Sequence, residues 1–199
     1  GQSSSTARGK EIVQEAVKKG IAKKGKDGEI VVKFKDLPEK VILRSDGTAL
    51  YATQDLGTAA LRNEKYKFDR MIYVVGSEQI LYFKQLFKLL EKLGYEWAKK
   101  CVHLPFGLMR FKETRISTRE GKVILLQDVL DEAQKRALHE IEKKNPKLKN
   151  KELVAEKIGV SALKYSTLAR EPIKTIEFSF DKALNFEGDS GPYLQYTYV

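Results

Sequence analysis

The stretch ILRSDGTALYATQDLG, residues 42–57, decides the fold because it joins a β-rich segment to a helix through a Ser-Asp-Gly turn. The pattern after this turn predicts a helix from about Thr48 to Asn63. Tyr51 and Asp55 are four positions apart in it and therefore share one helical face. A carboxylate beside an aromatic ring suits a guanidinium group, which it can hold by two parallel hydrogen bonds. The alternative interpretation is a surface helix whose Asp55 faces water.

The composition restricts the class of protein. The 199 residues include one cysteine, so a disulfide framework and cysteine-based zinc sites are excluded, and a reducing compartment, the cytoplasm, is expected. We expect no membrane partner, because no apolar run is long enough to span a bilayer. The net charge of +10 favours a polyanionic partner such as nucleic acid. A lysine-rich solvated surface explains the same charge equally well.

Upstream of the opening stretch, the sequence predicts a small β element and one helix. EIVVKF (29–34) and KVIL (40–43) form a predicted strand pair around a turn that contains Pro38. A helix is expected over residues 11–19, because apolar residues recur at helical spacing and Gly20 follows. Residues 1–8 are small and polar, so we expect a flexible start or a tag remnant outside the fold.

Downstream, a strand, a helix and a second strand follow one another. RMIYVV (70–75) is typical of a buried parallel strand, residues 79–93 predict an amphipathic helix, and CVHL (101–104) reads as a short strand. This order predicts a βαβ unit and hence an α/β fold with a parallel sheet. Two further amphipathic helices are expected at 127–142 and 151–169, and Pro192 is expected to start a last helix, capped by Ser190 or Asp189.

The carboxyl end of the first of these strands is the expected ligand-binding edge. GSEQ (76–79) lies there: Gly76 allows close approach to the backbone, the free helix amides can meet an anion or an adenine edge, and Gln79 offers donors and acceptors. An ordinary strand-to-helix turn is the alternative. The chain contains no phosphate loop of the Walker type.

A second candidate is the loop FKETRISTREGK (111–122), which combines cations with hydroxyl groups. Such a loop can clamp a triphosphate and stabilise the charge that develops during transfer at the α-phosphorus. The alternative is a solvated charged loop. His103 lies in an apolar strand and is expected to be a core residue, and no sequence pattern supports covalent nucleophilic catalysis.

Four segments, in order, closely resemble the catalytic domain of class I arginyl-tRNA synthetases: SDGTALYATQDLG, VVGSEQILYFKQ, ISTREGKVILLQDVLDEA and GDSGPYLQY. The similarity covers essentially residues 8–199. It implies a ligase that activates arginine with ATP to arginyl-adenylate and then transfers it to the terminal ribose of tRNA(Arg). The implied partners are arginine, ATP with Mg²⁺ as a substrate complex, and tRNA(Arg), and no structural metal is expected.

The resemblance also assigns site residues. It places the arginine pocket at Tyr51, Asp55 and Gln79, and the ATP-binding segment at Gly76, Glu78, Phe83 and Gln85. The loop RISTR matches the family's K-M-S-K-S signature, so the catalytic group is expected at Lys112, Arg115, Ser117, Thr118 and Arg119. Arg115 replaces the usual first lysine, and its planar fork is not equivalent to a compact ammonium.

One family signature is absent: neither histidine belongs to an H-I-G-H motif. The expected organisation is therefore a flexible start at 1–8, the second half of a nucleotide-binding catalytic domain at 9–130 with a β insertion at 28–44, and a helical extension at 131–199 leading toward an anticodon-binding domain. The fold class expected is a partial class I synthetase Rossmann-like parallel sheet with flanking helices.

We expect this chain to be inactive alone. The alternative is a non-catalytic synthetase-like module that binds RNA or a protein partner, and a generic nucleotide-binding regulator ranks last.

Overall fold

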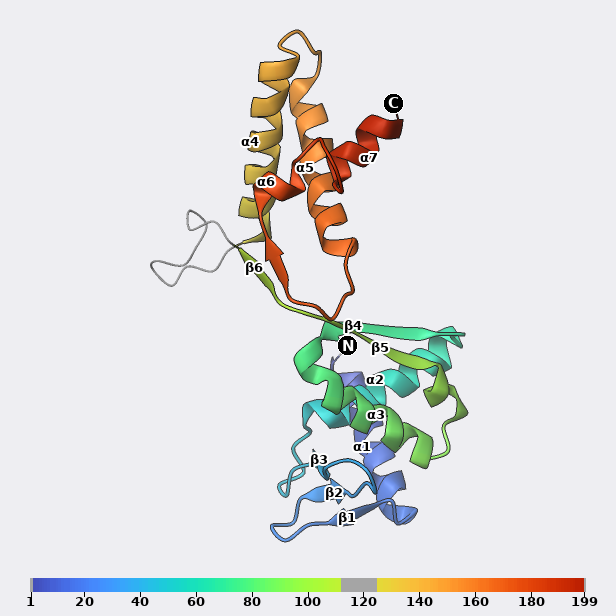
Figure 1. Ribbon diagram of the computed structural model, residues 1–199. Helices are drawn as coiled ribbons and strands as arrows, with labels where there is room; N and C mark the ends of the chain where they lie inside the picture. The colour runs from blue at the N-terminus through green and yellow to red at the C-terminus, as the bar shows by residue number, and fades with distance from the viewer. Residues whose placement is uncertain (1, 112–124, 199) are drawn as a thin grey trace. The chain divides into compact units, whose positions relative to one another are not determined.

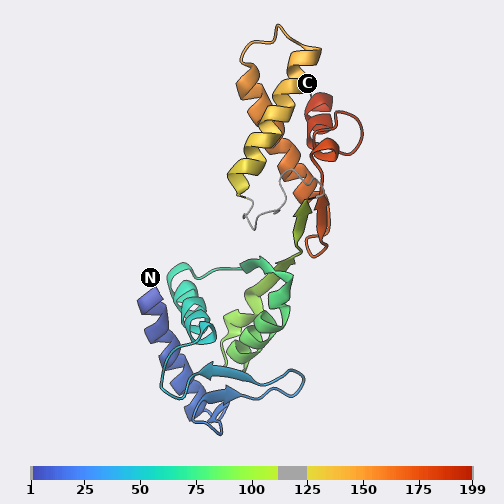
Figure 2. The ribbon, with the colours of Figure 1, turned by 90° about the vertical axis from the view of Figure 1, so that its left-hand side faces the viewer.

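The computed structural model describes residues 2–111 and 125–198, apart from the side chain of residue 2. The chain divides into two compact units, Gly1–Pro105 and Phe106–Val199. The first contains helices α1, α2 and α3 with two small sheets, and the second contains α4 to α7 with one (Figures 1 and 2). This mixed α/β architecture confirms the expected fold class. The predicted boundary between the catalytic half and the helical extension, at residue 130, is not tested by this division and stays a prediction.

In the first unit, a three-stranded antiparallel sheet precedes the central helices. Its strands β1 (Ala22–Lys24), β2 (Ile30–Val32) and β3 (Lys40–Leu43) lie in the order β1-β2-β3. The predicted strand pair corresponds to β2 and β3. Strand β1 is an addition that the sequence did not indicate, because it is three residues long and two of them are lysines.

The strand–helix–strand unit is present as expected. β4 (Met71–Gly76) and β5 (Cys101–Phe106) are neighbours in one sheet, and α3 (Ile80–Lys92), between two short 3₁₀ turns, connects them. Helix α2 (Tyr51–Tyr66) precedes this unit. The core is formed by apolar faces of the three helices and the small sheet, and its fully buried members include Ile12, Val13, Val32, Ile42, Leu56, Leu89 and Leu90.

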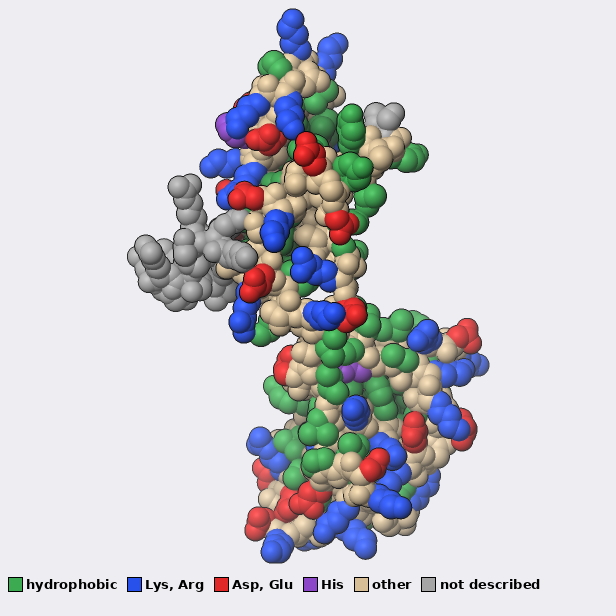
Figure 3. Space-filling model, in the orientation of Figure 1, with side chains coloured by type: hydrophobic (Ala, Val, Ile, Leu, Met, Phe, Trp, Pro, Cys, Tyr) green, Lys and Arg blue, Asp and Glu red, His purple; other side chains and the backbone are tan. Residues whose placement is uncertain are grey.

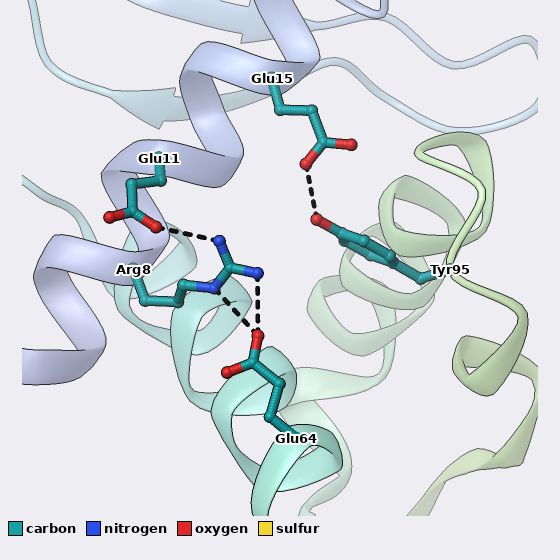
Figure 4. A network of polar contacts seen from close by, with 5 residues as sticks. All are labelled: Arg8, Glu11, Glu15, Glu64 and Tyr95. Carbon is teal, nitrogen blue, oxygen red and sulfur yellow. Dashed lines mark hydrogen bonds and ion pairs between the residues drawn. The ribbon is translucent and has the colours of Figure 1, made fainter.

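Helix α1 (Gln2–Lys18) corrects one prediction: residues 2–8 are helical rather than a flexible start. Tertiary contacts explain the difference. The Arg8 guanidinium lies between Glu11 of its own helix and Glu64 of α2, with a 2.9 Å contact to each, and Glu15 of α1 accepts a hydrogen bond from the Tyr95 hydroxyl (Figure 4). These contacts join α1 to distant parts of the unit, so packing outweighs the weak helix propensity of small polar residues.

The second unit is built on a helix pair. α4 (Leu126–Lys144) and α5 (Lys151–Leu168) pack through small residues, and the strands β6 (Met109–Phe111) and β7 (Ile176–Phe178) form a parallel pair. The short α6 (Phe180–Ala183) and α7 (Gly191–Tyr198) complete it. Both long helices and the last helix were predicted, whereas β6, β7 and α6 were not. The expected cap is confirmed for Ser190, whose Oγ accepts a hydrogen bond from the Tyr193 amide at 3.2 Å.

Candidate functional site

Asp55 is the centre of the candidate site. It lies on α2 and is half-buried, and its Oδ2 accepts a hydrogen bond from the hydroxyl of Tyr82 on α3. Burial, together with the hydrogen bond to Asp55, raises the pKa of Tyr82. The alternative interpretation, a carboxylate that simply faces water, does not describe this position, because the side chain is held between two helices.

Tyr51 lies one turn before Asp55, at the first position of α2. Tyr51 is 82 % exposed, so its ring is open to a ligand on the helical face that also carries the carboxylate. The joint use of this ring and the Asp55 carboxylate to hold a guanidinium stays a prediction.

The GSEQ turn lies where expected, at the end of β4. Gly76 is buried, and the space where a Cβ would lie is occupied by the carboxylate of Glu78, which is at the end of a flexible side chain. Gln79 is half-buried, ends the 3₁₀ turn Ser77–Gln79 and immediately precedes α3. Tyr82 follows Gln79 by about one helical turn, and the turn is thereby linked to Asp55 through α3.

Two residues predicted to bind ATP are engaged in internal contacts. Gln85 is buried, and its Nε2 donates a hydrogen bond to the Pro38 carbonyl at 2.8 Å, which fixes α3 to the loop before β3. Phe83 is buried against Tyr73, with ring centroids 5.1 Å apart, and stacks on His103 at 4.4 Å. Their part in ATP binding stays a prediction. Through these contacts both residues hold α3, the helix that carries Tyr82, in place.

His103, predicted to be a core residue, is half-buried, and its ring is engaged in internal contacts. Its Nε2 donates a hydrogen bond to the Val75 carbonyl at 2.9 Å, which joins β5 to β4 next to the GSEQ turn. The predicted catalytic group lies outside the described residues: Lys112, Arg115, Ser117, Thr118 and Arg119.

Sequence reasoning missed the surroundings of Asp55. The ammonium of Lys40 on β3 lies 4.7 Å from the centroid of the Tyr82 ring. The hydroxyl of Tyr73 on β4 is buried without a hydrogen-bond partner among the described residues. The pKa of Tyr73 is raised to about 12, chiefly because the group is buried. Asp55 and Tyr82 are 27 positions apart, so no local spacing signals their contact.

Within residues 2–111 and 125–198, the structure contains no cluster of three metal-ligating side chains. None of the helices in these same ranges has the length and apolar character needed to cross a membrane.

Comparisons with known proteins agree on one family. The family described as tRNA synthetases class I (R), catalytic domain, matches residues 1–180. The arginine–tRNA ligase of Clostridium perfringens is 44 % identical over 189 residues, which is 94 % of this chain and 34 % of that protein. The arginine–tRNA ligase of Halothermothrix orenii is 43 % identical over 190 residues, 95 % of this chain and 34 % of that protein. This chain thus spans about a third of the length of these relatives.

Solved structures give the same result. The Thermus thermophilus arginyl-tRNA synthetase superimposes with a TM-score of 0.78 and 26 % identity, over 96 % of this chain and 39 % of that one. The Plasmodium falciparum arginyl-tRNA synthetase superimposes with a TM-score of 0.83 over 96 % of this chain and 33 % of that one, and at 20 % identity this likeness shows the fold alone.

Proposed function

The chain belongs to the family of class I tRNA synthetase catalytic domains specific for arginine, and from this membership we propose that it is part of an ATP-dependent arginine–tRNA ligase. The observation that carries the proposal is the Asp55 carboxylate. It is half-buried, held by Tyr82, and carried on the same helical face as the exposed ring of Tyr51. In this proposal, Asp55 holds the guanidinium of arginine and Tyr51 covers it.

The proposed reaction has two steps. The α-carboxylate of arginine attacks the α-phosphorus of ATP, which gives arginyl-adenylate and releases pyrophosphate. A terminal ribose hydroxyl of tRNA(Arg) then attacks the carbonyl carbon of the adenylate and releases AMP. Gly76 ends β4 and Gln79 ends the turn that follows it, and in this proposal they meet the nucleotide and the substrate amino acid. Mg²⁺ would arrive with ATP as part of the substrate.

The segment FKETRISTREGK (111–122) is the proposed triphosphate clamp. Lys112, Arg115 and Arg119 would stabilise the developing charge, with Ser117 and Thr118 as hydroxyl donors. This assignment is supported by the likeness of RISTR to the family's signature loop. The net charge of +10 supports tRNA as the polyanionic partner, and the single cysteine supports the cytoplasm as the compartment.

We also propose that the active enzyme contains polypeptide beyond this segment. The relatives are about three times as long. In the β4–β5 sheet, Ile72, Val74 and Leu104 are 51 %, 62 % and 41 % exposed. Hydrophobic side chains are visible on the surface of the first unit (Figure 3). Sheets of the parallel α/β class are covered on both faces, so further polypeptide would bury these side chains. The segment alone should be inactive or nearly so.

The test begins with the mass of the native polypeptide in its source cells, detected with an antibody against this chain. A species far above 22.7 kDa that exchanges pyrophosphate into ATP only with arginine, and not with its neutral analogue citrulline, supports the ligase. A species near 22.7 kDa that binds tRNA in a salt-dependent manner without arginine or ATP would instead support the RNA-binding alternative.

A further inference from the structure

The contact between Tyr82 and Asp55 gives one residue a role beyond the pocket itself. We propose that Tyr82 is a positioning residue for arginine recognition: its hydroxyl fixes the plane of the Asp55 carboxylate so that a guanidinium can bind through two parallel hydrogen bonds. This inference rests on the proposed function. The two residues come from different helices, α2 and α3, and the hydroxyl donates to Oδ2 of Asp55.

The need for such a residue follows from the chemistry of a bidentate contact. The terminal torsion of an aspartate is broad, so a carboxylate without a fixed partner rotates. A guanidinium fork requires both carboxylate oxygens in its own plane. A hydrogen bond at Oδ2 restrains that rotation, yet it leaves Oδ1 and the second lone pair of Oδ2 free to accept.

Tyr82 is itself held in place. Its ring packs edge-on against Phe83, with centroids 5.3 Å apart, and the ammonium of Lys40 lies 4.7 Å from its centroid. Phe83 is in turn buried among Tyr73, Phe87 and His103. The hydroxyl is therefore carried on a packed aromatic cluster, which is how a supporting group gains the precision that a binding site needs.

A neutral donor also preserves the charge that the pocket uses. The partner of Asp55 in this contact is a phenol, whose pKa is raised by burial and by Asp55 itself, so it stays protonated and uncharged. A lysine or arginine in the same place would neutralise the carboxylate before arginine arrived. Tyr82 therefore orients Asp55 without weakening its preference for a cation over a neutral side chain.

The experiment replaces Tyr82 by phenylalanine in the native-length enzyme. We expect Tyr82→Phe to raise the KM for arginine by about 10-fold to 100-fold, the range for losing a hydrogen bond to a charged group, and to leave the KM for ATP within about twofold. The selectivity for arginine over citrulline should fall as well. KM does not depend on the amount of folded enzyme, so partial unfolding of the variant would not imitate this result.

The matched control is Tyr95→Phe. Tyr95 donates the same kind of hydrogen bond, to Glu15 at 2.7 Å in the same unit, away from Asp55. It should leave the KM for arginine unchanged. Equal effects of Tyr82→Phe and Tyr95→Phe, or equal changes in KM for arginine and ATP, would overturn the positioning role.

A third variant separates this inference from the proposed function. If Asp55→Asn leaves arginine use intact, the arginine pocket itself is refuted. If Asp55→Asn impairs arginine use and Tyr82→Phe does not, only the role of Tyr82 is refuted.

Discussion

Gly57 of α2 packs directly against Gly9 of α1: a Cβ at Gly57 would lie 2.5 Å from the Gly9 nitrogen and 2.0 Å from the Ser5 carbonyl oxygen. In the reverse direction, a Cβ at Gly9 would lie 1.8 Å from the carbonyl oxygen of Thr53. Thr53 is fully buried, and its hydroxyl donates a hydrogen bond to the Ile42 carbonyl. The backbones of α1 and α2 thus approach each other closely, and α2 is the helix that carries Asp55.

Replacing Gly57 by alanine should therefore destabilise the protein. Alanine normally favours a helix over glycine by about 1 kcal/mol, but the added methyl group must displace α1, and overpacking of this kind costs about 1–3 kcal/mol. The atoms that the methyl group would meet belong to the α1 backbone, so the cost should lie in the upper part of this range. We therefore expect the free energy of unfolding to fall by about 1–2 kcal/mol, measured by urea unfolding followed by circular dichroism. Lys65→Ala on the exposed face of α2 is the control and should change stability little. An unchanged or raised midpoint for Gly57→Ala would contradict the close crossing.

Local sequence patterns predicted the helices that carry the site. They did not predict the features that depend on contacts between residues far apart in the chain. The apolar stripe of α3 and the turn before α2 are encoded within a few residues, and both helices lie close to where they were expected. Residues 2–8 are helical because of Gly57 and Glu64, about fifty positions away in the chain, so the segment itself carries little signal. The three-residue strands β6 and β7 are too short for a period of two to show. Tyr51 and Asp55 could be paired from their spacing, whereas the donor at Tyr82 required the fold.

The raised pKa values of three tyrosines predict that the folded protein loses stability at high pH. Burial raises the pKa of Tyr73 and of Tyr95 to about 12, and the pKa of Tyr82 is raised in the same direction. In the unfolded chain these phenols ionise near their ordinary value of about 10. Because the folded pKa of Tyr73 and of Tyr95 is higher, their contribution to stability is fully present below about pH 10 and is lost as the pH rises from about 10 to about 12. The contribution of Tyr82 is lost in the same direction.

The ultraviolet absorbance of tyrosinate measures the ionisation of these phenols directly. We expect the folded protein to show a late ionisation step above pH 10 that coincides with unfolding, and the urea-unfolded chain to titrate in one step near 10. Tyr95→Phe should diminish the late step. A single step near pH 10 in the folded protein would contradict the burial of these hydroxyls.

Cys101 should be nearly inert in the folded protein. The thiol is free, its residue is 8 % exposed, and burial raises its pKa to about 11. The thiolate is the reactive form, so alkylation by iodoacetamide at neutral pH should be about 100-fold slower than in the urea-unfolded chain, where the thiol has its ordinary pKa. Intact mass reports the result unambiguously, because the chain has one cysteine. Labelling at equal rates in both states would show that β5 opens readily around Cys101.

The charge of Asp55 is the property on which arginine recognition should depend most. Asp55→Asn keeps the size of the side chain and an oxygen that can accept from Tyr82, but it removes the negative charge that a guanidinium needs. Loss of one partner of a desolvated charge pair costs about 2–5 kcal/mol, so kcat/KM for arginine in the native-length enzyme should fall by about 30-fold or more.

The control is Lys26→Ala, which removes an exposed charge from the turn between β1 and β2 and should have little effect. Arginine-dependent pyrophosphate exchange measures both variants, with citrulline as the neutral competitor. Equal, small losses in the two would remove Asp55 from the pocket and leave the selectivity for arginine to residues elsewhere.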